Sequence, residues 1–327
     1  MQSLFDRELL VVTGKGGVGK TTIAAAAGLA GARAGRRTIV VEVGQESRLP
    51  GLFGLPSARP GVPCALAANL WGLSIDPDRA LLEWLQVLGG RVSGRVLASS
   101  GTFQYFAAAA PGAKELVTMV KIWRLTTARG ARAGTAGHDL VVLDAPATGH
   151  ALGLLGSPHT FGAIARVGPI AGQTRKVQEL LQNPQRSAYL GVALATEMAV
   201  TEALELQDGL RTRLGRELAA VVVNALLPQR FSAAELERIA SVAQQRASAP
   251  DSSPQDADQE ERARRRAVTD AALSAAQTVH RRARFQHNQL ARLRRREFTV
   301  LGIPFMWRAQ LDAAAVGAIA TRLQRAL

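Results

Sequence analysis

The strongest constraint on the fold is a glycine-rich loop near the amino terminus, Gly14-Lys15-Gly16-Gly17-Val18-Gly19-Lys20-Thr21-Thr22. An apolar run, Leu9–Thr13, precedes this loop, and a helix-forming stretch, Thr21–Ala34, follows it. Glycines let successive backbone N–H groups point at one phosphate, and the start of the helix adds a partial positive charge. Lys20 places its ammonium against the β and γ phosphates, and Thr21 offers a hydroxyl to Mg²⁺. The loop therefore predicts a site for a nucleoside triphosphate.

A second lysine, Lys15, stands at the start of the loop, where it cannot duplicate the role of Lys20. There it can balance charge that builds up on the phosphates during transfer, and it can do so from a facing subunit. Because burial of a lysine without an anionic partner is costly, we expect a nucleotide in a partner subunit to supply the anion. A two-fold axis makes this arrangement reciprocal. Lys15 therefore predicts a homodimer.

A carboxylate follows another apolar run, since Asp144 begins the sequence Asp144-Ala145-Pro146-Ala147-Thr148-Gly149-His150. At the carboxyl end of a strand beside the phosphate loop, Asp144 is positioned to hold Mg²⁺ through water. The proline and glycine after it indicate a loop that can move with the γ phosphate. His150 has no companion ligand in the sequence, so we interpret it as a packed histidine.

Apolar runs alternate with helical stretches along the chain. The unbroken Val and Leu content of these runs favours strands that are covered on both faces, as in a parallel sheet. The alternation predicts an α/β fold with a doubly wound, mostly parallel sheet. The predicted strands are Leu9–Thr13, Thr38–Val43, Leu140–Asp144, Tyr189–Leu194 and Ala219–Asn224, and the most distinct helices are Thr21–Ala34, Val200–Leu214 and Ala309–Ala326.

We interpret residues 1–327 as one domain with two interruptions. The first, residues 76–137, is predicted to be an inserted helical subdomain, because Asp76-Pro77 supplies an N-cap and a proline at the first helical position. This stretch holds many large side chains, which either pack the helices onto the sheet or line a groove for an apolar client such as a membrane protein. They are Trp84, Phe103, Tyr105, Phe106, Met119 and Trp123.

The second interruption, residues 248–259, has no apolar side chain larger than alanine and is predicted to be a flexible linker. A helix precedes it, opened by a capping box of Ser232 and Glu235. An arginine-rich helix over residues 260–297 is expected to follow, because apolar residues recur there at helical spacing. Its arginines form a solvated face, or they contact RNA or acidic lipid.

The chain carries 40 basic and 26 acidic residues, which gives a net charge of +14. Such an excess favours contact with nucleic acid, phosphates or acidic lipids. Only five of the basic residues are lysines, however, so a GC-rich coding bias toward arginine is a competing explanation. Phe285 is the only Phe, Tyr or Trp between residues 232 and 297, so no base-stacking platform accompanies the arginines. We expect no sequence-specific binding of nucleic acid.

The single cysteine, Cys64, excludes a disulfide framework within the chain and a cysteine-based zinc site within one subunit. The sequence shows no signal peptide and no uncharged apolar run of about 18 residues. We therefore expect a cytoplasmic protein without a membrane span.

With these motifs together, the chain resembles the ArsA family of ATPases, which includes the arsenite pump and the eukaryotic ATPase that targets tail-anchored membrane proteins. The loop matches the deviant Walker A motif, GKGGVGKTT, of P-loop NTPases in that family. The ending Thr148-Gly149-His150 matches the family's switch II, D-x-x-P-T-G-H, although Pro146 stands one place earlier. The likeness is greatest to the single-domain bacterial branch. Three further segments agree: Ala108–Leu125, Ala195–Leu206 and Val221–Pro228.

The resemblance implies a Mg²⁺-dependent ATPase that acts as a nucleotide-gated homodimer and couples hydrolysis to a client. By position, it implies that Lys15 reaches the partner's nucleotide, that Asn224 reads adenine and that Ile303-Pro304-Phe305 covers the adenine from its other side. Thr21 and Asp144 would hold the Mg²⁺. The implied ATP-binding residues are Gly14, Lys15, Gly16, Gly17, Val18, Gly19, Lys20, Thr21, Thr22, Asn224, Pro304 and Phe305.

Two departures from the family pattern change what we expect. The family's switch I, D-P-A-H, has an aspartate that orients the attacking water, and Gly44 stands in its approximate place here. Glu42 and Glu46 are the candidates to replace this aspartate, and we take Glu46 as a catalytic candidate together with Lys15 and Asp144. Because the aspartate itself is missing, we expect slow hydrolysis. The several cysteine thiolates that bind the metalloid and the C-x-x-C pair for a bridging zinc are both missing, so arsenite is not the expected client.

Two alternatives stay open on the sequence alone. One is a partition-type ATPase, similar to ParA and MinD proteins, that acts on nucleic acid or a membrane surface through its arginines. The other is a nucleotide-sensing binding module that does not hydrolyse ATP.

Overall fold

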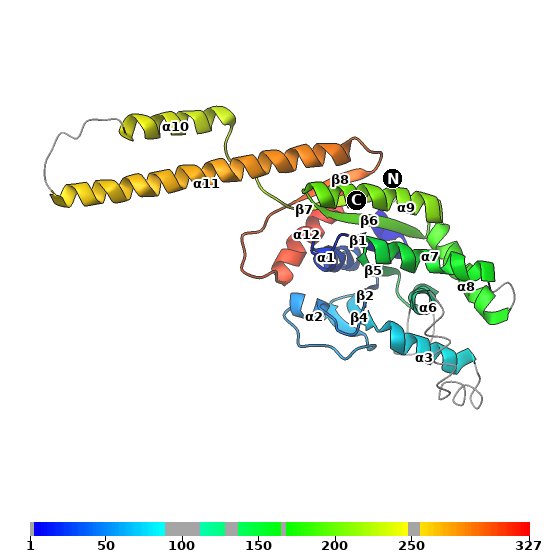
Figure 1. Ribbon diagram of the computed structural model, residues 1–327. Coiled ribbons are helices and arrows are strands. Elements are labelled where there is room, and N and C mark those ends of the chain that lie inside the picture. Colours follow the sequence, from blue (N-terminus) through cyan, green and yellow to red (C-terminus); the bar gives the residue numbers. More distant parts are fainter. Residues whose placement is uncertain (1–2, 89–111, 128–136, 165–167, 248–255) are drawn as a thin grey trace.

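The computed structural model describes residues 3–88, 112–127, 137–164, 168–247 and 256–327. At its centre is an eight-stranded sheet with the strand order β3-β4-β2-β5-β1-β6-β7-β8 (Figure 1). All neighbouring strands are parallel except β3 and β4, which are antiparallel. The strands are β1 (Leu9–Gly14), β2 (Thr38–Val43), β3 (Cys64–Ala67), β4 (Leu70–Ile75), β5 (Leu140–Ala147), β6 (Ser187–Leu194), β7 (Ala220–Leu226) and β8 (Thr299–Pro304).

The five predicted strands are confirmed as β1, β2, β5, β6 and β7, and so is the doubly wound, mostly parallel α/β fold. One local expectation is wrong. The backbone after Asp144 continues as strand to Ala147, and α7 (Thr148–Ile164) begins at the next residue, so no separate loop follows the carboxylate.

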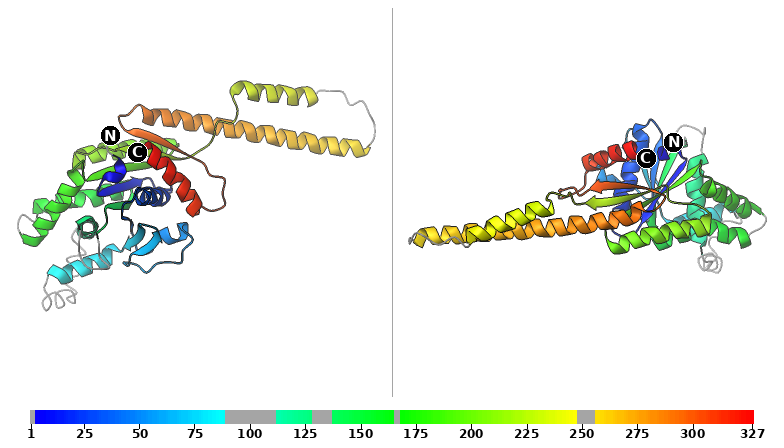
Figure 2. Two further views of the ribbon diagram at one scale, coloured as in Figure 1. Left: turned by 180° about the vertical axis from the view of Figure 1, so that it is seen from behind. Right: turned by 90° about the horizontal axis from the view of Figure 1, so that it is seen from above.

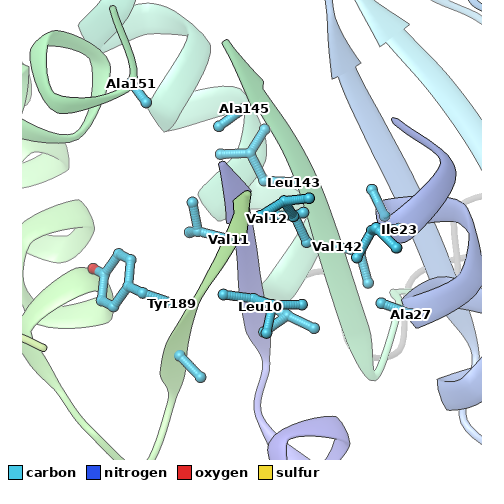
Figure 3. Close-up of a cluster of buried hydrophobic side chains, with 14 of the residues drawn as sticks. Leu10, Val11, Val12, Ile23, Ala27, Val142, Leu143, Ala145, Ala151 and Tyr189 are labelled. Carbon is cyan, nitrogen blue, oxygen red and sulfur yellow. The ribbon is translucent and has the colours of Figure 1, made fainter. Parts of the chain in front are cut away.

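Helices cover both faces of the sheet (Figure 2). On one face, α1 (Lys20–Arg33) packs against α12 (Ala313–Ala326), while α7 and α9 (Glu197–Leu214) pack together on the other. Figure 3 shows the core around β1, where Leu10 and Val12 point toward Ile23 of α1 and Val11 points the other way, toward Tyr189. This alternation follows from the two-residue period of a strand, and it buries β1 on both faces.

Within the predicted helical insertion, the structure describes α3 (Pro77–Leu88) and α6 (Ala113–Thr127), which pack against each other. The predicted helix start is confirmed, since the N–H of Asp78 donates to the Asp76 carboxylate over 2.9 Å. Met119 is buried, and Trp84 and Trp123 pack against the core, so these side chains face inward. The bounds 76–137 stay a prediction. Residues 89–111, with Phe103, Tyr105 and Phe106, and residues 128–136 lie outside the described part of the chain.

Two helices, α10 (Ala233–Ala247) and α11 (Asp256–Arg294), run side by side away from the sheet (Figures 1 and 2). The predicted capping box is confirmed, because the N–H of Glu235 donates to Ser232 Oγ at 3.2 Å and the N–H of Ser232 to Glu235 Oε2 at 2.8 Å. Helix α11 begins at Asp256, so the last four residues of the expected linker are helical, and residues 248–255 are not described. The arginine-rich helix thus starts earlier than expected and ends at Arg294.

The remaining elements are short or peripheral to the sheet: the 3₁₀ turn η1 (Leu4–Asp6), α2 (Leu49–Leu52) and α8 (Gly168–Gln182). Among the helices that the structure describes, none has both the length and the apolar composition that a membrane crossing requires.

Candidate functional site

The glycine-rich loop joins the carboxyl end of β1 to the start of α1, as predicted. At Gly14 a Cβ atom would lie 2.0 Å from the backbone oxygen of Val192, so a side chain there would collide with β6. Gly19 has φ of +92°, in the left-handed region that favours glycine, and a Cβ there would lie 2.4 Å from Asn224 Nδ2. The loop therefore has the close backbone packing and turned conformation that a phosphate cradle needs.

Lys20, the first residue of α1, points back across the loop. Its ammonium donates a hydrogen bond to the backbone oxygen of Lys15 over 3.0 Å. Burial lowers the pKa of Lys20, while the nearby carboxylates of Asp144 and Glu202 act in the opposite direction. A bound phosphate would offer this ammonium a charged acceptor in place of the carbonyl.

Thr21 and Asp144 meet where the loop faces the end of β5. The Thr21 hydroxyl donates to Asp144 Oδ2 over 2.6 Å, while the buried Oδ1 atom has no hydrogen-bond partner among the residues that the structure describes. Burial, with repulsion from Glu42 as a smaller cause, raises the pKa of Asp144 to about 6, against the hydrogen bond from Thr21 and the charge of Lys20.

An unpartnered carboxylate oxygen beside a threonine hydroxyl fits the predicted Mg²⁺ site. This ion binds through one or two protein groups and completes its octahedron with water and phosphate oxygens. In the described part of the chain, no group of three or more His, Cys, Asp or Glu side chains is arranged to hold a metal by itself. The residues present therefore suit a metal that arrives with a nucleotide.

Lys15 has a partner that the sequence analysis did not single out. Its ammonium forms an ion pair with Glu202 of α9, in the same chain, and both side chains are about two-thirds buried. The expectation that only a partner's nucleotide supplies the anion for Lys15 is therefore wrong for the empty subunit. Glu202 lies within the segment Ala195–Leu206 that supported the family resemblance, but its role depends on the packing of α9 against β1 and β6.

Of the residues predicted to hold adenine, Asn224 lies next to the loop, and Pro304 and Phe305 lie beside the end of β7. Asn224 Nδ2 donates to the backbone oxygen of Val18 over 3.0 Å, which fixes the end of β7 against the loop. The N–H of Phe305 donates to the backbone oxygen of Leu226 over 2.8 Å, so the residues after β8 stay beside those that follow Asn224. Pro304 is the last residue of β8. The structure thus brings the predicted base-binding residues together.

The two candidates for orienting water have different environments. Glu42 is buried at the end of β2 and accepts hydrogen bonds from the Ser47 hydroxyl and the N–H groups of Arg48 and Leu49, the second at 3.1 Å. Glu46 is exposed in the bend that follows β2. Glu42 therefore holds the backbone of this bend, while Glu46 is accessible to solvent.

The start of α7 holds two further residues of the resemblance to switch II. Thr148 is buried, and within the described part of the chain its hydroxyl has no hydrogen-bond partner. His150 is exposed, so its interpretation as a packed histidine is wrong. The buried hydroxyl of Thr148 lies directly after the end of β5. Nothing in the sequence alone distinguished Thr148 from the residues beside it as a buried polar group.

Comparison with known proteins agrees with this geometry. The family model described as anion-transporting ATPase, ArsA_ATPase, matches residues 7–173. The ATPase BagA of Mycobacterium tuberculosis is 32% identical over 240 residues, which cover 71% of this chain and 69% of that protein. The arsenical pump-driving ATPase of Acidiphilium multivorum is 25% identical over 253 residues, which cover 72% of this chain and 42% of that protein.

Proposed function

Because the chain belongs to the anion-transporting ATPase (ArsA) family and is an ATPase, we propose that it is Mg²⁺-dependent and works as a nucleotide-gated homodimer. Because the chain belongs to this family, we set aside the partition-type ATPase as an alternative. Because it is an ATPase, we also set aside the binding module that does not hydrolyse ATP. One observation carries the proposal. The Thr21 hydroxyl and the Asp144 carboxylate meet at the mouth of the loop, and one buried oxygen of Asp144 has no hydrogen-bond partner in the part of the chain that the structure describes.

In this proposal the loop and Lys20 hold the β and γ phosphates, and Asn224 with Phe305 holds the base. Thr21 contributes its hydroxyl and Asp144 its carboxylate to the Mg²⁺ site. When bound, Mg²⁺ neutralises charge that develops on the phosphates. Glu42 keeps the bend after β2 in place, so that Glu46 or a water beside it is presented to the site.

The gating step would use Lys15. In the empty subunit Glu202 satisfies its charge. Phosphates carry more negative charge than one carboxylate, so a triphosphate in a facing subunit is a stronger partner, and ATP would close the dimer. Hydrolysis removes the γ phosphate and favours reopening. Helix α3 packs against α6, and α6 packs against α7, so these helices would carry this motion to an apolar or membrane-protein client.

Arsenite is not proposed as the client, although some relatives are named arsenical pump-driving ATPases. A metalloid site needs several thiolates, and the chain has one cysteine, Cys64, whose pKa is raised by burial.

Titration calorimetry with Mg-ATP tests the assignment of the phosphate site. Lys20→Ala removes one charge-assisted contact and should weaken binding about ten- to hundredfold. Lys114→Ala, which removes a partly exposed lysine of α6 paired with Asp78, is the matched control and should bind as the wild type does. Equal affinities of the Lys20→Ala variant and the wild type would contradict the proposal.

A further inference from the structure

The last part of β7 is irregular. Between the pairs Val223–Gly302 and Leu226–Pro304, β7 fits one more residue than β8, so the strand carries a β-bulge. Within this bulge Ala225 has φ of +55°, a value that is uncommon for a residue with a side chain and that persists only where its surroundings fix it. Bulges re-aim side chains, and they are frequent beside functional sites. The backbone around Ala225 therefore needs support from neighbouring groups.

The bulge aims the side chain of Asn224 at the glycine-rich loop. Asn224 Oδ1 accepts a hydrogen bond from the N–H of Ala225 over 2.9 Å, and Nδ2 donates to the backbone oxygen of Val18 over 3.0 Å. Both ends of the amide are thus held. The packing is also tight, since a Cβ atom at Gly19 would collide with Nδ2. A change in the bulge therefore reaches the loop through Asn224.

Gln286 of α11 supports the bulge. Its Oε1 accepts from the N–H of Leu227 over 2.8 Å, and its Nε2 donates to the backbone oxygen of Ala225 over 3.4 Å. A bulge disrupts the strand ladder, and the backbone groups that leave the ladder still need partners. One glutamine amide supplies both an acceptor and a donor. Because α11 contacts β7 and β8, this support comes from the base of the projecting helix (Figure 1).

We propose that Gln286 is a positioning residue for the nucleotide site and that it couples α11 to the glycine-rich loop through the bulge and Asn224. This inference rests on the proposed function, because it requires a nucleotide on that loop. It adds a means of regulation: a partner or a change that shifts α11 alters the affinity for nucleotide. Since coupling is reciprocal, a bound nucleotide also stabilises the position of α11.

A double-mutant cycle tests the route through Asn224. The Kd for Mg-ATP is measured by calorimetry for the wild type, Gln286→Leu, Asn224→Ala and the variant with both changes. Gln286→Leu keeps the approximate size of the side chain and removes both hydrogen bonds, so it should raise the Kd about five- to tenfold. In the Asn224→Ala background the same change should have little further effect, because the route to the loop is already broken.

Two further variants and a second readout accompany the cycle. Gln277→Leu makes the same substitution at an exposed glutamine of α11 and should bind as the wild type does. Gln286→Glu keeps an oxygen that can accept from the N–H of Leu227, so it should lose less affinity than Gln286→Leu. Hydrogen exchange at this N–H should slow when a nonhydrolysable ATP analogue binds the wild type. In Gln286→Leu it should not respond to the analogue.

The contrary results differ from one another. A wild type that does not bind Mg-ATP would overturn the proposed function and this inference with it. If the wild type binds and Gln286→Leu binds equally well, the proposed function stands and the coupling to α11 is wrong. Equal losses from Gln286→Leu in both backgrounds would exclude the route through Asn224 and assign Gln286 to general stability. Should Gln286→Leu fail to fold, the cycle is run with Gln286→Glu, and the same comparison decides.

Discussion

Glu42 of β2 and Asp144 of β5 occupy paired positions on neighbouring parallel strands. Two buried carboxylates therefore stand side by side near the carboxyl ends of these strands, on the same side of the sheet as the glycine-rich loop. Their surroundings differ. Glu42 accepts hydrogen bonds from the bend that follows its own strand, whereas Asp144 accepts one bond from Thr21, and its other oxygen has no partner among the described residues. Glu42 is therefore a structural acceptor, and Asp144 is available to a metal.

The first prediction concerns the stability of the nucleotide-free and metal-free protein. Burial raises the pKa of Asp144 to about 6 in the folded chain, from 3.8. The folded state therefore binds this proton more tightly, and its contribution to stability is present below pH 4 and is lost as the pH rises through 6. Asp144→Asn removes that penalty, so its free energy of unfolding should exceed that of the wild type by about 2–3 kcal/mol above pH 6.

Urea unfolding at pH 4, 5, 6 and 7.5 checks this prediction, with the difference between the two proteins read at each pH. The difference should be small at pH 4 and should grow toward pH 6. A difference that is constant across this range would mean that Asp144 does not titrate as an isolated buried acid.

The second prediction concerns the hydrolysis rate of the same variant. Asp144→Asn keeps the size of the side chain but removes the charge that holds Mg²⁺, so phosphate release should fall about tenfold or more. The affinity for ATP should change less, because the loop and Lys20 still hold the phosphates. Turnover equal to that of the wild type would show that Asp144 has no role at the metal.

The third prediction separates Glu42 from Glu46. Glu42→Gln weakens the acceptor of three groups in the bend, so it should lower the free energy of unfolding by about 1–3 kcal/mol and also slow hydrolysis. Glu46→Gln should slow hydrolysis without a loss of stability, because Glu46 is exposed. Thermal unfolding and phosphate release are measured on both variants. If Glu46→Gln hydrolyses ATP at the normal rate, another group orients the water.

Sequence patterns were sufficient for the buried parallel strands, because continuous Val and Leu runs such as Leu9–Val12 favour strands that are covered on both faces. They were insufficient for β4 and β8, where Gly72, Gly302 and Pro304 interrupt the pattern. A proline is tolerated at the end of β8 because this strand lies at the edge of the sheet, where one side of its backbone has no neighbouring strand.

The candidate site shows the same division between local and long-range information. The loop, Lys20 and Asp144 were predictable, because each role follows from residue type and position after a strand. Glu202 and Gln286 were not. Glu202 meets Lys15 across 187 residues of sequence, and Gln286 reaches the bulge of β7 only because α11 contacts β7 and β8. Contacts of this kind depend on strand order, which no local pattern encodes.

The fourth prediction concerns the arginines of α11. Arg264–Arg266 on α11 and Arg294–Arg296 at and just after its end are exposed, but Phe285 is the only large ring on that helix. We therefore expect weak binding of nucleic acid that falls steeply with salt and does not depend on sequence. Fluorescence anisotropy with two unrelated DNA duplexes and two unrelated RNAs, at low and physiological salt, measures this. A tight complex with one sequence at physiological salt would contradict the expectation.

The fifth prediction concerns the ion pair that occupies Lys15 in the empty subunit. Glu202→Gln removes the carboxylate that competes for Lys15. Lys15 should therefore pair more readily with the phosphates of the nucleotide in the partner subunit. Partly exposed ion pairs contribute about 0.5–1 kcal/mol each, and two of them break per dimer, which corresponds to about a five- to thirtyfold lower protein concentration for half-maximal dimer formation. Sedimentation with a nonhydrolysable ATP analogue measures that concentration. A Glu202→Gln protein that dimerises less readily would show that the glutamate instead orients Lys15 toward its partner.

The central claim is an ATP-gated dimer in which Lys15 serves the partner's nucleotide, and sedimentation velocity of the wild type and Lys15→Ala tests it most directly. Each protein is run at several concentrations with Mg²⁺ and either a nonhydrolysable ATP analogue or ADP. We predict that the analogue, more than ADP, shifts the wild type to a dimer, and that Lys15→Ala weakens this shift while each subunit still binds ATP. A wild type that stays monomeric with every nucleotide, or a Lys15→Ala protein that dimerises as fully as the wild type, would contradict the account.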